Sequence, residues 1–68
     1  MTMTVILNGQ ERRSADPLSL ADAVALLTAA PSGVAAAVNG EVVRRAAWPL
    51  TQLADGDEIE VVTAVQGG

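Results

Sequence analysis

The chain ends in Val65-Gln66-Gly67-Gly68, and a terminal glycine pair suits one kind of chemistry. Glycine has no Cβ, so two in succession can pass through a narrow channel and bring the terminal carboxylate close to a nucleotide. A four-residue tail reaches at most ~14 Å. We therefore expect Val65, Gln66 and Gly67 to thread into a partner's active site and to place the Gly68 carboxylate there. Taken alone, the glycine pair fits a frayed end or a leftover linker equally well.

The composition excludes several other kinds of site. With no Cys and no His among 68 residues, disulfides, thiolate catalysis and the usual zinc clusters are ruled out. The sequence has no Walker-type phosphate loop and no nucleophile placed beside a base. We therefore expect a protein that is not an enzyme, with no catalytic residue, no metal site and no bound cofactor of its own.

Charge and hydropathy restrict the partners and the location. The net charge is −4, with four Arg and no Lys, which argues against nucleic-acid binding because no basic stripe is available. No apolar run approaches the ~18 residues that cross a bilayer, and no signal peptide is visible. We expect a cytoplasmic protein with no membrane partner, docking on a basic surface of another protein.

Two hairpin signals organise much of the remaining chain. Two aliphatic runs, residues 3–7 and 34–38, are each followed by Asn-Gly and then by a second short strand pattern, residues 10–14 and 41–43. Asn-Gly is typical of the tight turns that join antiparallel strands. The sequence therefore predicts two β-hairpins, of which the first has a polar return strand suited to a sheet edge.

One amphipathic helix is predicted between the hairpins. Ser19, followed three residues later by Asp22, approximates a capping box at the start of a helix. Pro31 disfavours helical geometry in the preceding residue, so the helix should end near residue 29 or 30. Apolar residues then share one helical face: Leu20, Ala23, Val24 and Leu27.

The last strand is expected over residues 58–65. Ile59 and Val61 should point toward the helix, which leaves Val62 and Ala64 facing away from it. An apolar outer face on a sheet with no second layer suggests a docking surface. A central strand of a small sheet is also often apolar on both sides, and the pattern leaves both interpretations open.

Acidic residues gather just before the tail. Asp55, Asp57, Glu58 and Glu60 follow one another closely there, either as a solvated face or as part of a docking surface. We treat Asp57, Glu58 and Glu60, together with Val62 and Ala64, as candidate docking residues.

The order of predicted elements is strand, strand, helix, strand, short strand, loop and strand. Residues 48–53 lack either period and should form a loop with a short helical turn. Trp48 should close one end of the core, with contact to a partner as the alternative. The economical arrangement is an α+β fold whose first and last strands are adjacent and parallel. This is the β-grasp, or ubiquitin-like, architecture: a mixed sheet of four to five strands with one helix packed across one face. We expect a domain over residues 1–64 and a flexible tail over 65–68.

Residues 38–43 and 53–68, with Trp48 between them, resemble the ThiS sulfur-carrier family of thiamine biosynthesis. The segments 6–9 and 20–22 fit as well, so the similarity covers essentially the whole chain. The terminal glycines alone would also suit ubiquitin-type modifiers and the small subunit of molybdopterin synthase. This chain lacks the Pro-Pro pair usual before the tail in the latter and the Arg-containing tail of the former.

The resemblance implies a protein cosubstrate with two enzyme partners. A ThiF-like adenylyltransferase would use ATP and Mg²⁺ to adenylate the Gly68 carboxylate, and a cysteine-derived sulfur donor would convert it to a thiocarboxylate. A ThiG-like thiazole synthase would then accept the sulfur. The alternatives are a molybdopterin-synthase-type sulfur carrier subunit, a ubiquitin-like protein modifier and a non-covalent interaction module.

Overall fold

The computed structural model describes residues 2–27 and 33–63. The predicted helix end near residue 29 or 30 lies outside the described residues, and so does the part of the last strand expected beyond residue 63. Within the two described ranges, the elements in order are β1 (Met3–Leu7), β2 (Gln10–Ser14), α1 (Leu20–Leu27), β3 (Val34–Val38), β4 (Glu41–Val43), the 3₁₀ helix η1 (Arg45–Leu50) and β5 (Glu58–Thr63).

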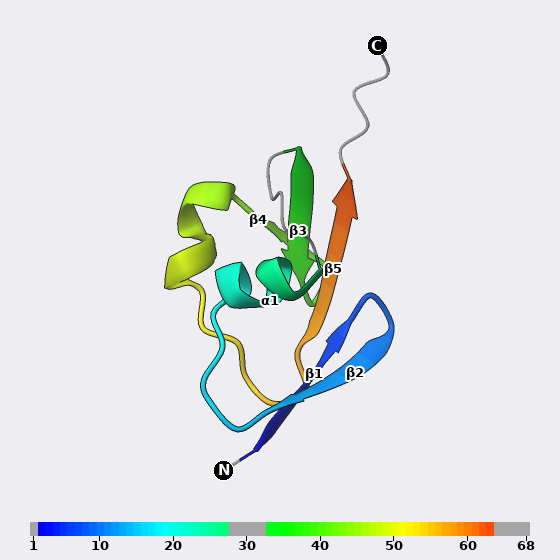
Figure 1. Cartoon of the computed structure of the whole chain (residues 1–68). Helices are drawn as coiled ribbons and strands as arrows, with labels where there is room; N and C mark the ends of the chain where they lie inside the picture. The colour runs from blue at the N-terminus through cyan, green and yellow to red at the C-terminus, as the bar shows by residue number, and fades with distance from the viewer. Residues whose placement is uncertain (1, 28–32, 64–68) are drawn as a thin grey trace.

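The strands form one five-stranded mixed sheet in the order β2-β1-β5-β3-β4. β1 and β5 are parallel neighbours, with Ile6 opposite Glu58, and the other neighbouring pairs are antiparallel. Figure 1 shows α1 lying across this sheet. The predicted β-grasp fold is confirmed, including the two hairpins and the parallel pairing of the first and last strands.

The helix and the sheet enclose a small aliphatic core. Trp48 is only 4% exposed, and its indole Nε1 donates a hydrogen bond to the Val43 carbonyl oxygen at 2.9 Å. The predicted role of Trp48 as part of the core is therefore confirmed. The buried apolar residues come from the three inner strands β1, β5 and β3, from α1 and from the segment between β4 and β5: Val5, Leu7, Leu20, Ala23, Val24, Ala36, Trp48, Leu53 and Ile59.

A reciprocal capping box fixes the start of α1, as predicted. The Asp22 backbone N–H donates to Ser19 Oγ at 3.1 Å, and the Ser19 N–H donates to Asp22 Oδ2 at 3.0 Å. The Leu20 N–H donates to the Thr51 carbonyl oxygen at 2.8 Å. These bonds satisfy N–H groups that a helix start otherwise leaves without partners.

The segment between β4 and β5 differs in its bounds from the prediction. We expected a short helical turn within residues 48–53, whereas the 3₁₀ helix η1 spans Arg45–Leu50. Pro49 lies inside it. A proline has no backbone N–H to donate, and it is tolerated here because so short a helix contains few backbone hydrogen bonds that could be lost. No helix in residues 2–27 or 33–63 has the length and apolar character needed to cross a membrane.

Candidate functional site

The central strand β5 leads directly to the predicted site. It lies between β1 and β3 and ends at Thr63, shortly before the tail. Val65, Gln66, Gly67 and Gly68 lie outside the described residues, as does Ala64. The structure therefore shows the base from which the tail departs, and the roles predicted for the tail itself stay predictions.

The side chains of β5 alternate between the core and the opposite side of the sheet. Ile59 is 1% exposed, and Val61 packs against the core. Val62 is 59% exposed, and Glu58 and Glu60 are exposed as well. The predicted inward direction of Ile59 and Val61 and the outward direction of Val62 are therefore confirmed.

Small side chains surround Val62 on the side of the sheet away from α1. Val62 lies opposite Ala35 in the ladder, Glu60 opposite Ala37, and Ala37 opposite Val42 on β4. Because the alanines are short, a shallow hollow of about 120 Å³ forms over β3, with Val42 and Val62 among its lining residues. We call the surface made by Ala35, Ala37, Val42, Glu60 and Val62 the outer face.

The acidic residues before the tail occupy two different environments. Both oxygens of the Asp57 carboxylate are engaged in the turn, Oδ2 by the Ala54 N–H at 2.7 Å and Oδ1 by Asn39 Nδ2 at 3.0 Å. Glu58 and Glu60 instead line a second hollow of about 380 Å³, and Glu60, which belongs to the outer face, lines the first hollow as well. The structure thus places the two glutamates next to the apolar hollow and gives Asp57 a role in folding the turn.

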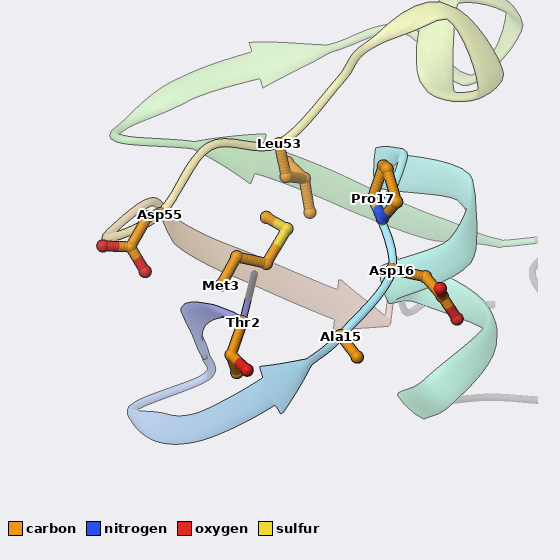
Figure 2. A pocket seen from close by; sticks show the side chains of 7 residues that line it. All are labelled: Thr2, Met3, Ala15, Asp16, Pro17, Leu53 and Asp55. Carbon is orange, nitrogen blue, oxygen red and sulfur yellow. The ribbon is translucent and has the colours of Figure 1, made fainter.

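A further depression of about 410 Å³ lies near the start of β1. In Figure 2, Asp16 and Asp55 lie on opposite sides of it, with Met3 and Leu53 between them. The Asp55 carboxylate accepts a hydrogen bond from the Thr4 N–H at 2.7 Å, so it also holds the strand start. Because β1 and β5 run parallel, a strand rise of ~3.3 Å per residue puts this depression roughly 25 Å from the end of β5.

Metal coordination has no support in the part of the chain that the structure describes. In residues 2–27 and 33–63, no three acidic side chains are placed to share a metal ion. Asp55 and Asp57 instead flank a tight turn in which Gly56 has a φ of 88°, a backbone conformation that glycine adopts without strain.

Two asparagines hold β5 from opposite edges, a role that the sequence analysis did not anticipate. Asn8 and Asn39 were predicted only as turn residues, and both do occupy turns with positive φ, 49° and 52°. In addition, Asn8 Oδ1 accepts from the Val61 N–H at 2.8 Å, and Asn39 Oδ1 accepts from the Glu58 N–H at 3.0 Å. The sequence held one signal for this role, because asparagine occupies the same position of both turns.

Comparisons with known proteins agree with this geometry. The chain resembles the crystal structure of a thiamine biosynthesis protein, ThiS, from Geobacter metallireducens, with 30% sequence identity and a TM-score of 0.79. The similarity covers 97% of this chain and all of that one. No match is found among curated proteins. The profile of the ThiS family matches residues 5–68, nearly the full length, and the chain therefore belongs to the ThiS family.

Proposed function

We propose that this protein carries sulfur for thiamine biosynthesis on the carboxyl group of Gly68. Membership of the ThiS family is the observation that carries the proposal. The similarity to a solved thiamine biosynthesis protein supports it. So does the fold, because the central strand of the sheet delivers the chain to its terminal glycines.

The chemistry follows from the weak reactivity of a carboxylate. A ThiF-like adenylyltransferase activates Gly68 with ATP and Mg²⁺, and the resulting acyl adenylate has AMP as a good leaving group. The terminal sulfur of a cysteine-derived persulfide displaces AMP to give an acyl disulfide, and a thiol reductant cleaves its S–S bond to leave a disulfide and the thiocarboxylate. Its soft, anionic sulfur attacks an electrophilic intermediate held by a ThiG-like thiazole synthase, and the carboxylate is restored. With no Cys in the chain, no internal thiol can divert the adenylate.

The carrier contributes position to this chemistry. Threading of Val65, Gln66 and Gly67 brings the carboxyl group to each enzyme, since glycine passes a narrow channel without steric conflict. The outer face is the docking surface, with the exposed Val62 supplying apolar contact next to the tail. Glu58 and Glu60 favour a partner surface with basic side chains, and Asp57 and Ala64 complete the predicted docking set.

An alkylation experiment tests the proposal. The full chain is incubated with ATP, the ThiF-like enzyme and a sulfur source, then treated with a thiol-alkylating reagent and analysed by intact and fragment mass spectrometry. Since the chain has no Cys, we expect ATP-dependent alkylation located at Gly68. Alkylation is preferable to mass alone, because exchange of oxygen for sulfur nearly matches oxidation of a methionine.

Two controls sharpen the result. Omission of ATP removes the activation step, and Gly68→Val replaces the residue that must enter the partner's active site. Both samples should stay unlabelled while the Val variant keeps its fold. If the wild-type chain stays unlabelled with an enzyme that is active on another carrier, the proposed sulfur-carrier function is refuted. It would then favour a protein modifier or an interaction module.

A further inference from the structure

The two edges of β5 are supported to different lengths. On the β3 edge, the antiparallel ladder continues to the end of the strand, where Val34 lies opposite Thr63. On the β1 edge, backbone pairing covers only Ile6 with Glu58 and Leu7 with Ile59. After Leu7 the chain turns away into the hairpin with β2, so β1 supplies no further strand residue beside Val61.

The Asn8 side chain takes the place of that missing strand residue. Its backbone N–H donates to the Ile59 carbonyl oxygen at 2.9 Å, the last backbone bond on this edge among the described residues. Its carboxamide then bonds both polar groups of Val61: Oδ1 accepts from the N–H at 2.8 Å, and Nδ2 donates to the carbonyl oxygen at 3.1 Å. A carboxamide offers the same donor and acceptor as a peptide group, so it extends the ladder by one residue.

Asn39 is a natural comparison for Asn8. It has the same turn conformation and the same following glycine, and it also bonds β5 through its carboxamide. It acts at the opposite end of the strand, however, on Glu58 and Asp57. Of the two side chains, only that of Asn8 reaches the part of β5 from which the tail departs.

We propose that Asn8 is a positioning residue for the C-terminal tail. Its carboxamide holds Val61 on the β1 edge of β5, so that the tail leaves the sheet in a fixed direction. This inference rests on the proposed carrier function. Without the carboxamide, the Val61 N–H and carbonyl bond to water, and β5 from Val61 onward is held on its β3 edge alone, which leaves it more mobile. A partner enzyme must then order those residues when it binds, and the lost conformational freedom weakens binding.

Asn8→Gly and Asn39→Gly form a matched pair of variants. Glycine accepts positive φ freely, so both variants keep their turns and each loses one carboxamide. Hydrogen exchange reports on the strand, and the Val61 amide should lose about tenfold or more of its protection in Asn8→Gly alone. The position of the tail is tested by adenylation with the ThiF-like enzyme, which is measured as ATP–pyrophosphate exchange at varied carrier concentration.

The expected kinetic result is a change in KM without a change in kcat. Loss of two hydrogen bonds to Val61 should raise the carrier KM of Asn8→Gly by about 5- to 10-fold, with kcat within about twofold. Asn39→Gly should keep its KM within about twofold of wild type. Asn8→Asp retains the acceptor for the Val61 N–H and loses the donor, so its KM should fall between wild type and Asn8→Gly.

The outcomes separate the inference from the function beneath it. A wild-type chain that the enzyme adenylates, together with equal KM values for the two glycine variants, overturns the role of Asn8 and leaves the carrier function intact. Retained protection of the Val61 amide in Asn8→Gly overturns it as well. A wild-type chain that is never adenylated refutes the proposed function and, with it, any positioning role in adenylation.

Discussion

Replacing Val62 by alanine tests the outer face as a docking surface. The substitution removes two methyl groups, each worth ~0.8 kcal/mol when buried. Val62 is 59% exposed in the free protein, so about that fraction of the transfer energy is available to a partner, or ~0.9 kcal/mol. We therefore expect the dissociation constant for the ThiF-like enzyme, measured by isothermal titration calorimetry, to rise about fivefold.

A matched substitution on the opposite side of the molecule provides the control. Leu26 is 52% exposed on α1, the helix that covers the other face of the sheet, so Leu26→Ala removes a comparable apolar surface away from Val62. Its dissociation constant should stay within about twofold of wild type. Loss of strand propensity in Val62→Ala costs up to ~1 kcal/mol, which leaves a small domain almost fully folded. Equal effects of the two variants, or no effect of Val62→Ala, would refute docking at Val62.

Three further substitutions test the fold and the charge of the site. Ser19→Ala breaks the capping box at a cost of ~1 kcal/mol, which should lower the melting temperature by about 7 °C in thermal circular dichroism of a chain of 68 residues; an unchanged melting temperature would contradict the role of the cap. Ile59→Ala leaves a cavity beneath β5 and should lower the free energy of unfolding by about 2–5 kcal/mol, measured in urea through the fluorescence of the buried Trp48. Glu60→Lys reverses a charge in the outer face and should weaken binding to the ThiF-like enzyme by about fivefold at low salt, with the difference shrinking near 1 M salt. Salt-independent weakening would instead indicate a steric effect at Glu60.

Local patterns predicted most of the fold. The two Asn-Gly turns are present with positive φ at Asn8 and Asn39, because few other residue pairs adopt that geometry without strain. The capping box at Ser19 and the alternation around Ile59 are also interactions between residues close in sequence. Hydrophobic periodicity and turn residues reflect such local contacts, so the sequence pattern predicts them. The parallel pairing of β1 with β5 was then inferred from the order of the elements.

Side-chain contacts between distant segments could not be predicted in the same way. The bonds from Asn8 to Val61 join residues 53 positions apart, and that from Asn39 to Glu58 joins residues 19 apart. An exposed turn asparagine has the same sequence signature whether its carboxamide faces water or a neighbouring strand. The register between β1 and β5 decides which occurs, and that register depends on packing of the whole core. The contacts of Asp57 with Ala54 and Asn39 were not predicted either, because an acidic run looks the same in the sequence whether its carboxylates face water or accept hydrogen bonds.

The support of β5 limits where a partner can act. Within the described residues, the ladder on one edge reaches Val34 and Thr63, and on the other edge the Asn8 carboxamide reaches Val61, two residues earlier on β5. Five residues separate Thr63 from the carboxyl group of Gly68, and even a fully extended chain gives them a reach of at most ~18 Å. A partner's active site must therefore lie within that distance of the strand end. The outer face at Val62 adjoins this end, whereas the depression near Met3 lies roughly 25 Å away along the sheet. Docking contacts that deliver Gly68 for chemistry are accordingly expected around Val62 and Glu60, where binding energy can fix the origin of the tail.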